Sequence, residues 1–221
     1  MKALFFRDIK IVWSEKSTFF LNILFFLAFA LTTVFALGPE TLVSKKIGPT
    51  IIWLATIFTI LLNFDLIFQK DQQDGSLDIL ILGQNTFSII TLIITKAAAH
   101  WVANIVPLLL IQPILDIMFH MDIKTSINTS ISLLIGTPAL TFIGTAGAAI
   151  ACTLSRGQFI CAMLVLPFVT PILLFGIQTS QGITEAEKFN ISFILLIACN
   201  CFFLIICPII AHLALKYLAE E

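Results

Sequence analysis

The chain reads STFFLNILFFLAFALTTVFAL from Ser17 to Leu37, and this run contains no charged residue. A helix that crosses the hydrocarbon core of a bilayer needs roughly 20 mostly apolar residues. The apolar part of a cleaved signal peptide is shorter, about 7–15 residues, and acids are not typical of the segment before it. We therefore expect Ser17–Leu37 to be a membrane-spanning helix that is retained in the mature protein.

Five further apolar runs follow along the chain. They cover about residues 47–65, 97–119, 127–153, 159–178 and 191–215. A shorter charge-free run, Ile79–Thr95, is broken by Gly83-Gln84-Asn85, which favours a segment near the membrane surface. We predict an all-α polytopic membrane protein with six transmembrane helices in a single domain, residues 1–221.

The composition supports a membrane protein. Hydrophobic residues make up 59% of the chain and charged residues only 11%, against roughly 25% charged in ordinary soluble domains. A soluble fold of this size cannot bury so much apolar surface, so a lipid bilayer must cover part of it. The formal net charge of -1 gives no general attraction to nucleic acid, and we expect no such partner.

Six crossings place both termini on the same side of the membrane. If that side is the cytoplasm, or the matrix of an organelle, the inner segments hold Lys2, Arg7, Lys10, Lys16, Lys70, Lys96, Arg156 and Lys216. The outer segments hold only Lys45, Lys46, Lys124 and Lys188. This excess of inner basic residues is the direction that the positive-inside rule expects.

Residues 1–16 have an amphipathic pattern. Phe5, Ile9 and Trp13 share one helical face, and Arg7 lies among the polar residues between them. We expect a helix that lies in the membrane interface. It is either a surface anchor that sets the orientation or an elbow helix that docks a partner.

The inner loop from Phe68 to Asp78 reads FQKDQQDGSLD and is the most polar part of the chain. Its Asp-Gly pair is a strong turn signal, and Ser76 is a suitable N-cap for a short helix that begins at Leu77. One interpretation is a solvated turn. The other is a cytoplasmic coupling helix that receives motion from an ATPase, formed by Asp71, Asp74, Gly75, Ser76, Leu77 and Asp78. No nucleophilic side chain lies beside these carboxylates in a catalytic pattern, so we expect no enzyme active site.

Glycine and proline are concentrated in the later runs. Gly136, Pro138 and Gly144 lie in the fourth run, and Pro167 and Pro171 lie in the fifth. Small residues permit close helix packing, whereas proline kinks or breaks helices and leaves carbonyl groups without donors. These positions are either packing sites or parts of a moving, broken-helix element.

Few other residues indicate chemistry within the apolar runs. Lys96 and Asp116 are expected near span ends, where side chains reach water, so no run carries the buried charges typical of an ion pathway. His100, His120 and His212 are candidate haem ligands, but we favour boundary residues because no second ligand is suitably spaced. The five cysteines match no zinc or redox spacing and are read as packing residues, with a metal or redox role as the alternative. We expect no metal site and no directly bound cofactor.

Several short motifs occur in a specific order along nearly the whole chain. They are Gly38-Pro39-Glu40, Asp74-Gly75-Ser76-Leu77, His100-Trp101, Gly136-Thr137-Pro138, Ser155-Arg156-Gly157 and Leu164-Val165-Leu166-Pro167. This order resembles the cytochrome c maturation protein B family, also called haem exporter protein B. The chain differs in having a single arginine at position 156, where family members often have two basic residues.

The resemblance implies an ABC-2-type permease fold and a membrane subunit of an ABC transporter in cytochrome c biogenesis. Haem is then the pathway substrate, and ATP binds a separate subunit, cytochrome c maturation protein A. This chain contains no Gly-x-x-x-x-Gly-Lys-[Ser/Thr] motif of its own. Further implied partners are the membrane proteins C and D, the haem chaperone E and a second permease copy. The implied location is the bacterial inner membrane or the mitochondrial inner membrane.

Within this resemblance, ATP hydrolysis drives haem export or release of the haem-loaded chaperone. The alternative is a membrane scaffold that only positions the chaperone complex. A stand-alone secondary transporter is disfavoured, because intramembrane charge is scarce and no inverted repeat is evident.

Overall fold

The computed structural model describes residues 2–14, 16–38, 41–62, 64, 66–73, 75, 85–152, 157–182 and 191–220. Throughout these ranges the chain is helical apart from short turns, with no strand. The helices are α1 (Lys2–Ser14), α2 (Lys16–Leu37), α3 (Thr41–Leu61), α4 (Leu66–Gln73), α6 (Thr86–Met118), α7 (Ile123–Cys152), α8 (Gly157–Gly182) and α9 (Ile191–Glu220). The all-α prediction is confirmed for this part of the chain.

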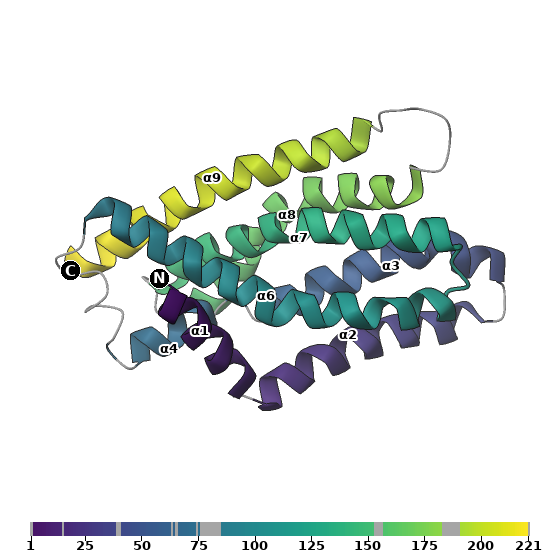
Figure 1. The fold of residues 1–221 in the computed structure, drawn as a ribbon, viewed down its shortest axis with the longest axis horizontal. Coiled ribbons are helices and arrows are strands. Elements are labelled where there is room, and N and C mark those ends of the chain that lie inside the picture. Colours follow the sequence, from purple (N-terminus) through teal and green to yellow (C-terminus); the bar gives the residue numbers. More distant parts are fainter. Residues whose placement is uncertain are drawn as a thin grey trace.

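The long helices form an elongated bundle, with α7 at its centre (Figure 1). Helix α7 packs against α6, α8 and α9. Within the most apolar window of each helix, 78% of the residues of α7 are buried in protein, against 17% in α2 and 22% in α9. Helix α7 is therefore enclosed by other helices, whereas α2 and α9 leave most of their apolar surface for lipid.

Small residues allow α7 to occupy this central position. Large aromatic side chains of neighbouring segments lie directly over two of its glycines: a Cβ atom on Gly136 would stand 2.6 Å from the ring of Trp53, and one on Gly144 would collide with the ring of Phe64. In lipid, where helix association depends on close contact and internal hydrogen bonds, such small positions let helices approach one another.

Within the described residues, four helices are long and apolar enough to cross a membrane. They are Phe19–Leu37, Thr86–Met118, Ile123–Cys152 and Ile191–Tyr217. Their outward faces carry large exposed apolar side chains, such as Phe35, Leu110 and Ile205, as expected of lipid-facing surfaces. The remaining expected spans, at 47–65 and 159–178, fall on α3 and α8, and their crossing of the membrane stays a prediction.

Helix α6 begins earlier than the sequence pattern indicates. The expected span starts at residue 97, but Asn85 has extended backbone angles and its carbonyl accepts hydrogen bonds from the N–H groups of Ser88 and Ile89. The helix therefore starts at Thr86 and continues through residue 95. Residues 86–95 are therefore the first part of α6, and their expected position near the membrane surface stays a prediction.

The inner loop also differs from expectation. A helix that the sequence pattern did not indicate, α4, occupies Leu66–Gln73, just before the Asp74-Gly75 turn signal. Its end is marked by Gly75, whose φ of 68° lies in the left-handed region that glycine adopts readily. The short helix expected from Leu77 lies outside the described residues.

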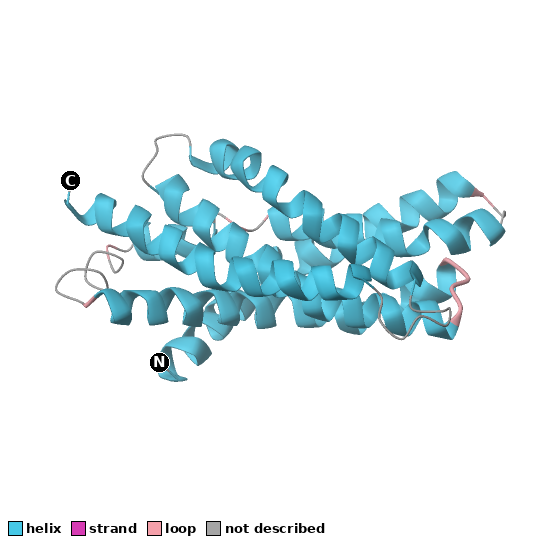
Figure 2. Cartoon of the chain, turned by 90° about the horizontal axis from the view of Figure 1, so that it is seen from above, coloured by secondary structure: helices cyan, strands magenta, loops and turns pink. Residues whose placement is uncertain are grey.

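Helix α1 and the C-terminal end of α9 lie at the same end of the bundle. Figure 1 places α1 and α4 near the chain ends marked N and C, and Figure 2 shows both ends on the same side from the perpendicular direction. An even number of membrane crossings produces this arrangement.

Candidate functional site

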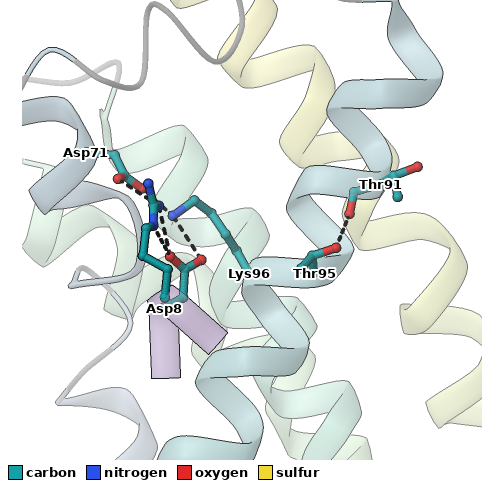
Figure 3. Close-up of polar contacts among 6 residues, drawn as sticks. Asp8, Asp71, Thr91, Thr95 and Lys96 are labelled. Atoms are coloured by element: carbon teal, nitrogen blue, oxygen red, sulfur yellow. Dashed lines mark hydrogen bonds and ion pairs between the residues drawn. The ribbon is translucent and has the colours of Figure 1, made fainter. Parts of the chain in front are cut away.

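Lys96 lies in the interior of α6, and its side chain is only 7% exposed. Its Nζ atom donates a hydrogen bond to Oδ2 of Asp71 on α4. The same Nζ lies 3.4 Å from Oδ2 of Asp8 on α1, an ion-pair contact without hydrogen-bond geometry. One ammonium group thus joins three helices (Figure 3).

Arg7 adds a second positive charge. Its Nη2 atom lies 2.8 Å from Oδ1 of Asp8 and 3.4 Å from Oδ1 of Asp71, and its Nε donates to the same Asp8 oxygen at 3.0 Å. We call Arg7, Asp8, Asp71 and Lys96 the Lys96 cluster. It contains two positive and two negative side chains, so its formal charge is zero.

The members of the Lys96 cluster differ in their contact with solvent. The side chains of Asp8 and Asp71 are 12% and 11% exposed, close to that of Lys96, whereas Arg7 is 39% exposed. Exposed ion pairs contribute little stability, but removing one partner of a buried pair costs about 3–5 kcal/mol because a charge is left uncompensated. Within the cluster, we therefore expect the loss of the Lys96–Asp71 contact to be the most destabilising.

Both short helices are also held by contacts outside the cluster. Helix α1 packs along α6, and the indole Nε1 of Trp13 donates to the carbonyl oxygen of Ala103 at 3.3 Å. Helix α4 buries Ile67 and Phe68, and Nε2 of Gln72 donates to the carbonyl oxygen of Cys152 at 3.1 Å. The carboxylate of Asp71 thus reaches Lys96 from a helix that is anchored to α7.

Polar side chains continue from Lys96 into the bundle. His100 follows one turn along α6, and Nδ2 of Asn104 lies 3.3 Å from His100 Nδ1. Asn22 on α2 donates to Oδ1 of Asn104 at 3.1 Å. A small cavity of about 10 Å³, room for about one water molecule, lies among Asn22, Thr59, Ile60, His100, Asn104, Ile105, Leu108 and Thr141.

The sequence indicated the wrong environment for two charged residues. Lys96 and Asp116 were expected near water at span ends, but the structure buries both within the protein. The reason for Lys96 is the early start of α6, together with α1 and α4 lying against it. The expectation that no span carries several buried ionisable groups is therefore wrong for α6, which buries Lys96, His100 and Asp116.

Some of the residues expected in the elbow helix and the coupling helix contact one another in the structure. Of the elbow residues, Arg7 joins the cluster and Trp13 contacts α6, while Phe5 and Ile9 are half-buried on α1. Of the coupling residues, Asp71 joins the cluster, and Gly75 is exposed directly after α4. The remaining ones, Asp74, Ser76, Leu77 and Asp78, lie outside the described residues.

The expected break and packing residues lie in uninterrupted helices. Gly136, Pro138 and Gly144 are inside α7, and Pro167 and Pro171 are inside α8. Helices tolerate such prolines in membranes when neighbouring groups satisfy the freed backbone.

A buried tryptophan links the helices around Gly136. The Nε1 of Trp53 on α3 donates to Oγ of Ser132 on α7 at 3.1 Å and to Oγ of Ser180 on α8 at 3.2 Å. Its ring also lies where a Cβ on Gly176 would stand. Trp53, like Asp8 and Lys96, was not recognised from sequence as a site residue. For Lys96 a signal existed: it is a single charge between two apolar runs.

Metal ligands are not grouped in the described part of the chain. No set of three or more His, Cys, Asp or Glu side chains lies close enough together there to hold a metal ion. His100 contacts Asn104, and His212 is buried on α9.

Comparison with known proteins gives matches along nearly the whole chain. Heme exporter protein B of Bradyrhizobium diazoefficiens is 36% identical over 218 residues, which covers 98% of this chain and 97% of that protein. The Paracoccus denitrificans protein of the same name is 34% identical over 217 residues, 98% of each chain. The family model described as CcmB protein matches residues 1–217. The protein therefore belongs to the CcmB family, as the order of its motifs predicts.

Proposed function

We propose that this chain is the permease subunit of an ABC transporter complex that serves haem export in cytochrome c biogenesis. Support comes from family membership and from relatives named Heme exporter protein B that match over almost their full length. In this proposal haem is the pathway substrate, and ATP hydrolysis drives release of the haem-loaded chaperone.

The proposed permease domain covers residues 1–221 and crosses the bacterial inner membrane six times, with α3 and α8 as the additional crossings. Both termini lie on the cytoplasmic side. The common position of α1 and the end of α9 supports this topology, and so does the distribution of basic residues.

The proposed coupling mechanism rests on the contacts within the Lys96 cluster. An ATP-binding subunit on the cytoplasmic side would contact α4 and the segment after it. Because Asp71 is bonded to Lys96, displacement of α4 pulls directly on α6. Helix α1 follows the same motion through Asp8. We propose that α4 and α1 act as the coupling helix and the elbow helix of the permease.

The proposed partners follow from the family. They are the ATP-binding cytochrome c maturation protein A, the membrane proteins C and D, the haem chaperone E and a second copy of this chain. The sequence lacks a nucleotide-binding motif, so ATP hydrolysis is assigned to the partner.

Purification in mild detergent tests this function. We expect an ATP-binding subunit to co-purify with this chain, and we expect the ATPase activity of the complex to fall when the pair Asp71→Asn and Lys96→Met is introduced. The matched control neutralises another ion pair, Lys45 and Asp122, whose charged atoms lie 2.6 Å apart beyond the other end of α6. It should leave ATPase activity unchanged.

Two outcomes would contradict the permease proposal. The first is a complex that contains the haem chaperone but no ATPase, which is the result that a positioning scaffold gives. The second is ATPase activity that is insensitive to both pairs of substitutions.

A further inference from the structure

A second group of buried polar side chains lies at the opposite end of α6 from the Lys96 cluster. It comprises Gln112 and Asp116 on α6 and Ser126 on α7, and we call it the Asp116 pocket. Asp116 follows Lys96 by 20 positions, which is about 30 Å along a helix and close to the thickness of a bilayer core. The pocket therefore lies at the end of α6 that leads into the turn before α7.

The two α6 members of the Asp116 pocket are buried, and one carboxylate oxygen is hydrogen-bonded. Gln112 is 0% exposed and Asp116 is 3% exposed. Oδ2 of Asp116 accepts hydrogen bonds from Nε2 of Gln112 at 3.2 Å and from Oγ of Ser126. The same Gln112 nitrogen also lies 3.5 Å from the carbonyl oxygen of Ser126.

Two buried oxygens in the pocket accept no hydrogen bond from any described residue. They are Oδ1 of Asp116 and Oε1 of Gln112. The two side chains are one helical turn apart, and they are hydrogen-bonded to each other through Gln112 Nε2 and Asp116 Oδ2. Buried polar atoms nearly always have a partner, and each exception calls for an explanation such as a bound ion.

The charge of the pocket is also uncompensated. The carboxylates of the Lys96 cluster face Arg7 and Lys96, whereas no Lys, Arg or His among the described residues forms an ion pair with Asp116. Burying an ionised carboxylate alone costs several kcal/mol. Asp116 also lies in the last turns of α6, where the helix dipole is negative. Both effects favour a positive guest.

We propose that the Asp116 pocket binds one monovalent metal cation, Na⁺ or K⁺, between Asp116 Oδ1 and Gln112 Oε1. Oxygen atoms are the ligands that hard cations prefer. A single carboxylate matches a single positive charge, whereas Ca²⁺ sites usually gather several carboxylates. The bound cation strengthens the junction between the end of α6 and the start of α7, where Ser126 already contacts Asp116.

Thermal unfolding of the full chain in detergent tests the site. At constant ionic strength, NaCl or KCl should raise the Tm relative to choline chloride, and the rise should increase with cation concentration as expected of a ligand that binds the folded state. Asp116→Asn keeps the shape of the side chain but removes its charge, and should abolish this dependence. Gln112→Leu should weaken it.

Asp122→Asn is the matched control. It also removes one carboxylate close to the end of α6, but that side chain is exposed and paired with Lys45. The cation-dependent rise in Tm should survive this substitution.

Direct binding of radioactive sodium to the wild-type protein keeps the test decisive if Asp116→Asn does not fold. We expect saturable binding that unlabelled Na⁺ or K⁺ displaces. Absence of saturable binding would overturn the proposal. An Asp116→Asn variant that is as stable as the wild type in every salt would also overturn it. Asparagine resembles a protonated aspartic acid, so equal stability would mean that a proton, and not a metal cation, neutralises Asp116.

Discussion

Lys96 illustrates how one buried charge constrains several helices. Its ammonium group has almost no access to water and depends on Asp71 and Asp8 for compensation. Neither carboxylate is on the same helix as Lys96, so the positions of α4 and α1 are fixed relative to α6. The contact is valuable for geometry rather than for net stability, because charge burial offsets much of the attraction.

Substituting one member of this pair should be more harmful than substituting both. Lys96→Met removes the buried ammonium group that faces Asp71 and Asp8, and should lower the free energy of unfolding by about 3–5 kcal/mol. The double variant with Asp71→Asn should lose less than the sum of the single losses. The free energy of unfolding in mixed micelles is measured for the wild type, the two single variants and the double variant. Strictly additive losses would contradict the direct contact.

Gly144 should tolerate no larger side chain. A Cβ at this position collides with the ring of Phe64, so Gly144→Val should destabilise the protein by about 1–3 kcal/mol through overpacking. The same unfolding assay provides the measurement. The control is Ala36→Val on the exposed part of α2, which should change stability far less. An equal loss in both variants would exclude the contact with Phe64 as the cause.

At the scale of elements, the sequence predicts helices better than it predicts their ends. The run Ser17–Leu37 is recovered as part of α2, because an unbroken apolar run has a single stable solution in lipid. The start of α6 was mispredicted, and α4 was not expected at Leu66–Gln73. Gly83 and Asp74-Gly75 signal turns but do not indicate whether the segment beside them is helical, and tertiary contacts such as the bond from Gln72 to Cys152 help to hold α4 in place.

The site was predictable only in part for the same reason. Asp71 and Arg7 could be nominated because they stand in the two polar segments of an apolar chain. Their meeting point could not, since the pairing of Arg7 with Asp71 joins residues that are 64 positions apart. Asp116 was assigned to a water-accessible span end because burial by a neighbouring helix leaves no local pattern in the sequence.

The segment that follows α4 should be needed for coupling rather than for insertion. Replacing Asp74 and Asp78 together by lysine changes charge at the end of the bundle proposed to contact the ATPase. We expect normal membrane insertion but loss of cytochrome c maturation in cells that depend on this variant. Asp122→Lys, at the opposite end of α6, should insert and support maturation. Normal maturation with the first variant would remove this segment from the coupling mechanism.

At the scale of the whole molecule, the bundle has one polar end and a long apolar flank. Helices α1 and α4 gather at the end where the chain also starts and finishes (Figure 1). Among the described residues, length and apolar composition identify four helices that could cross a membrane, and α3 and α8, whose crossing stays a prediction, pack against α7. Composition alone does not identify α3 as a membrane-crossing helix, because Lys45 and Lys46 lie in its first part.

Reporter fusions should reveal the orientation of the bundle. A green fluorescent protein joined after Glu221 should fluoresce, because the C-terminus is proposed to lie in the cytoplasm. Alkaline phosphatase, which is active only outside the cytoplasm, should be active when fused after His120, in the turn between α6 and α7. The reverse pattern of activities would contradict the proposed topology.

The zero formal charge of the Lys96 cluster has an electrical consequence. Moving one elementary charge across a membrane potential of 100 mV involves about 2.3 kcal/mol of work. A lone Lys96 would therefore be pushed by the voltage across an energised membrane whenever α6 moved. With Arg7, Asp8 and Asp71 moving alongside it, the opposing forces cancel. The four side chains of the Lys96 cluster can therefore shift depth as a unit with no net electrical work.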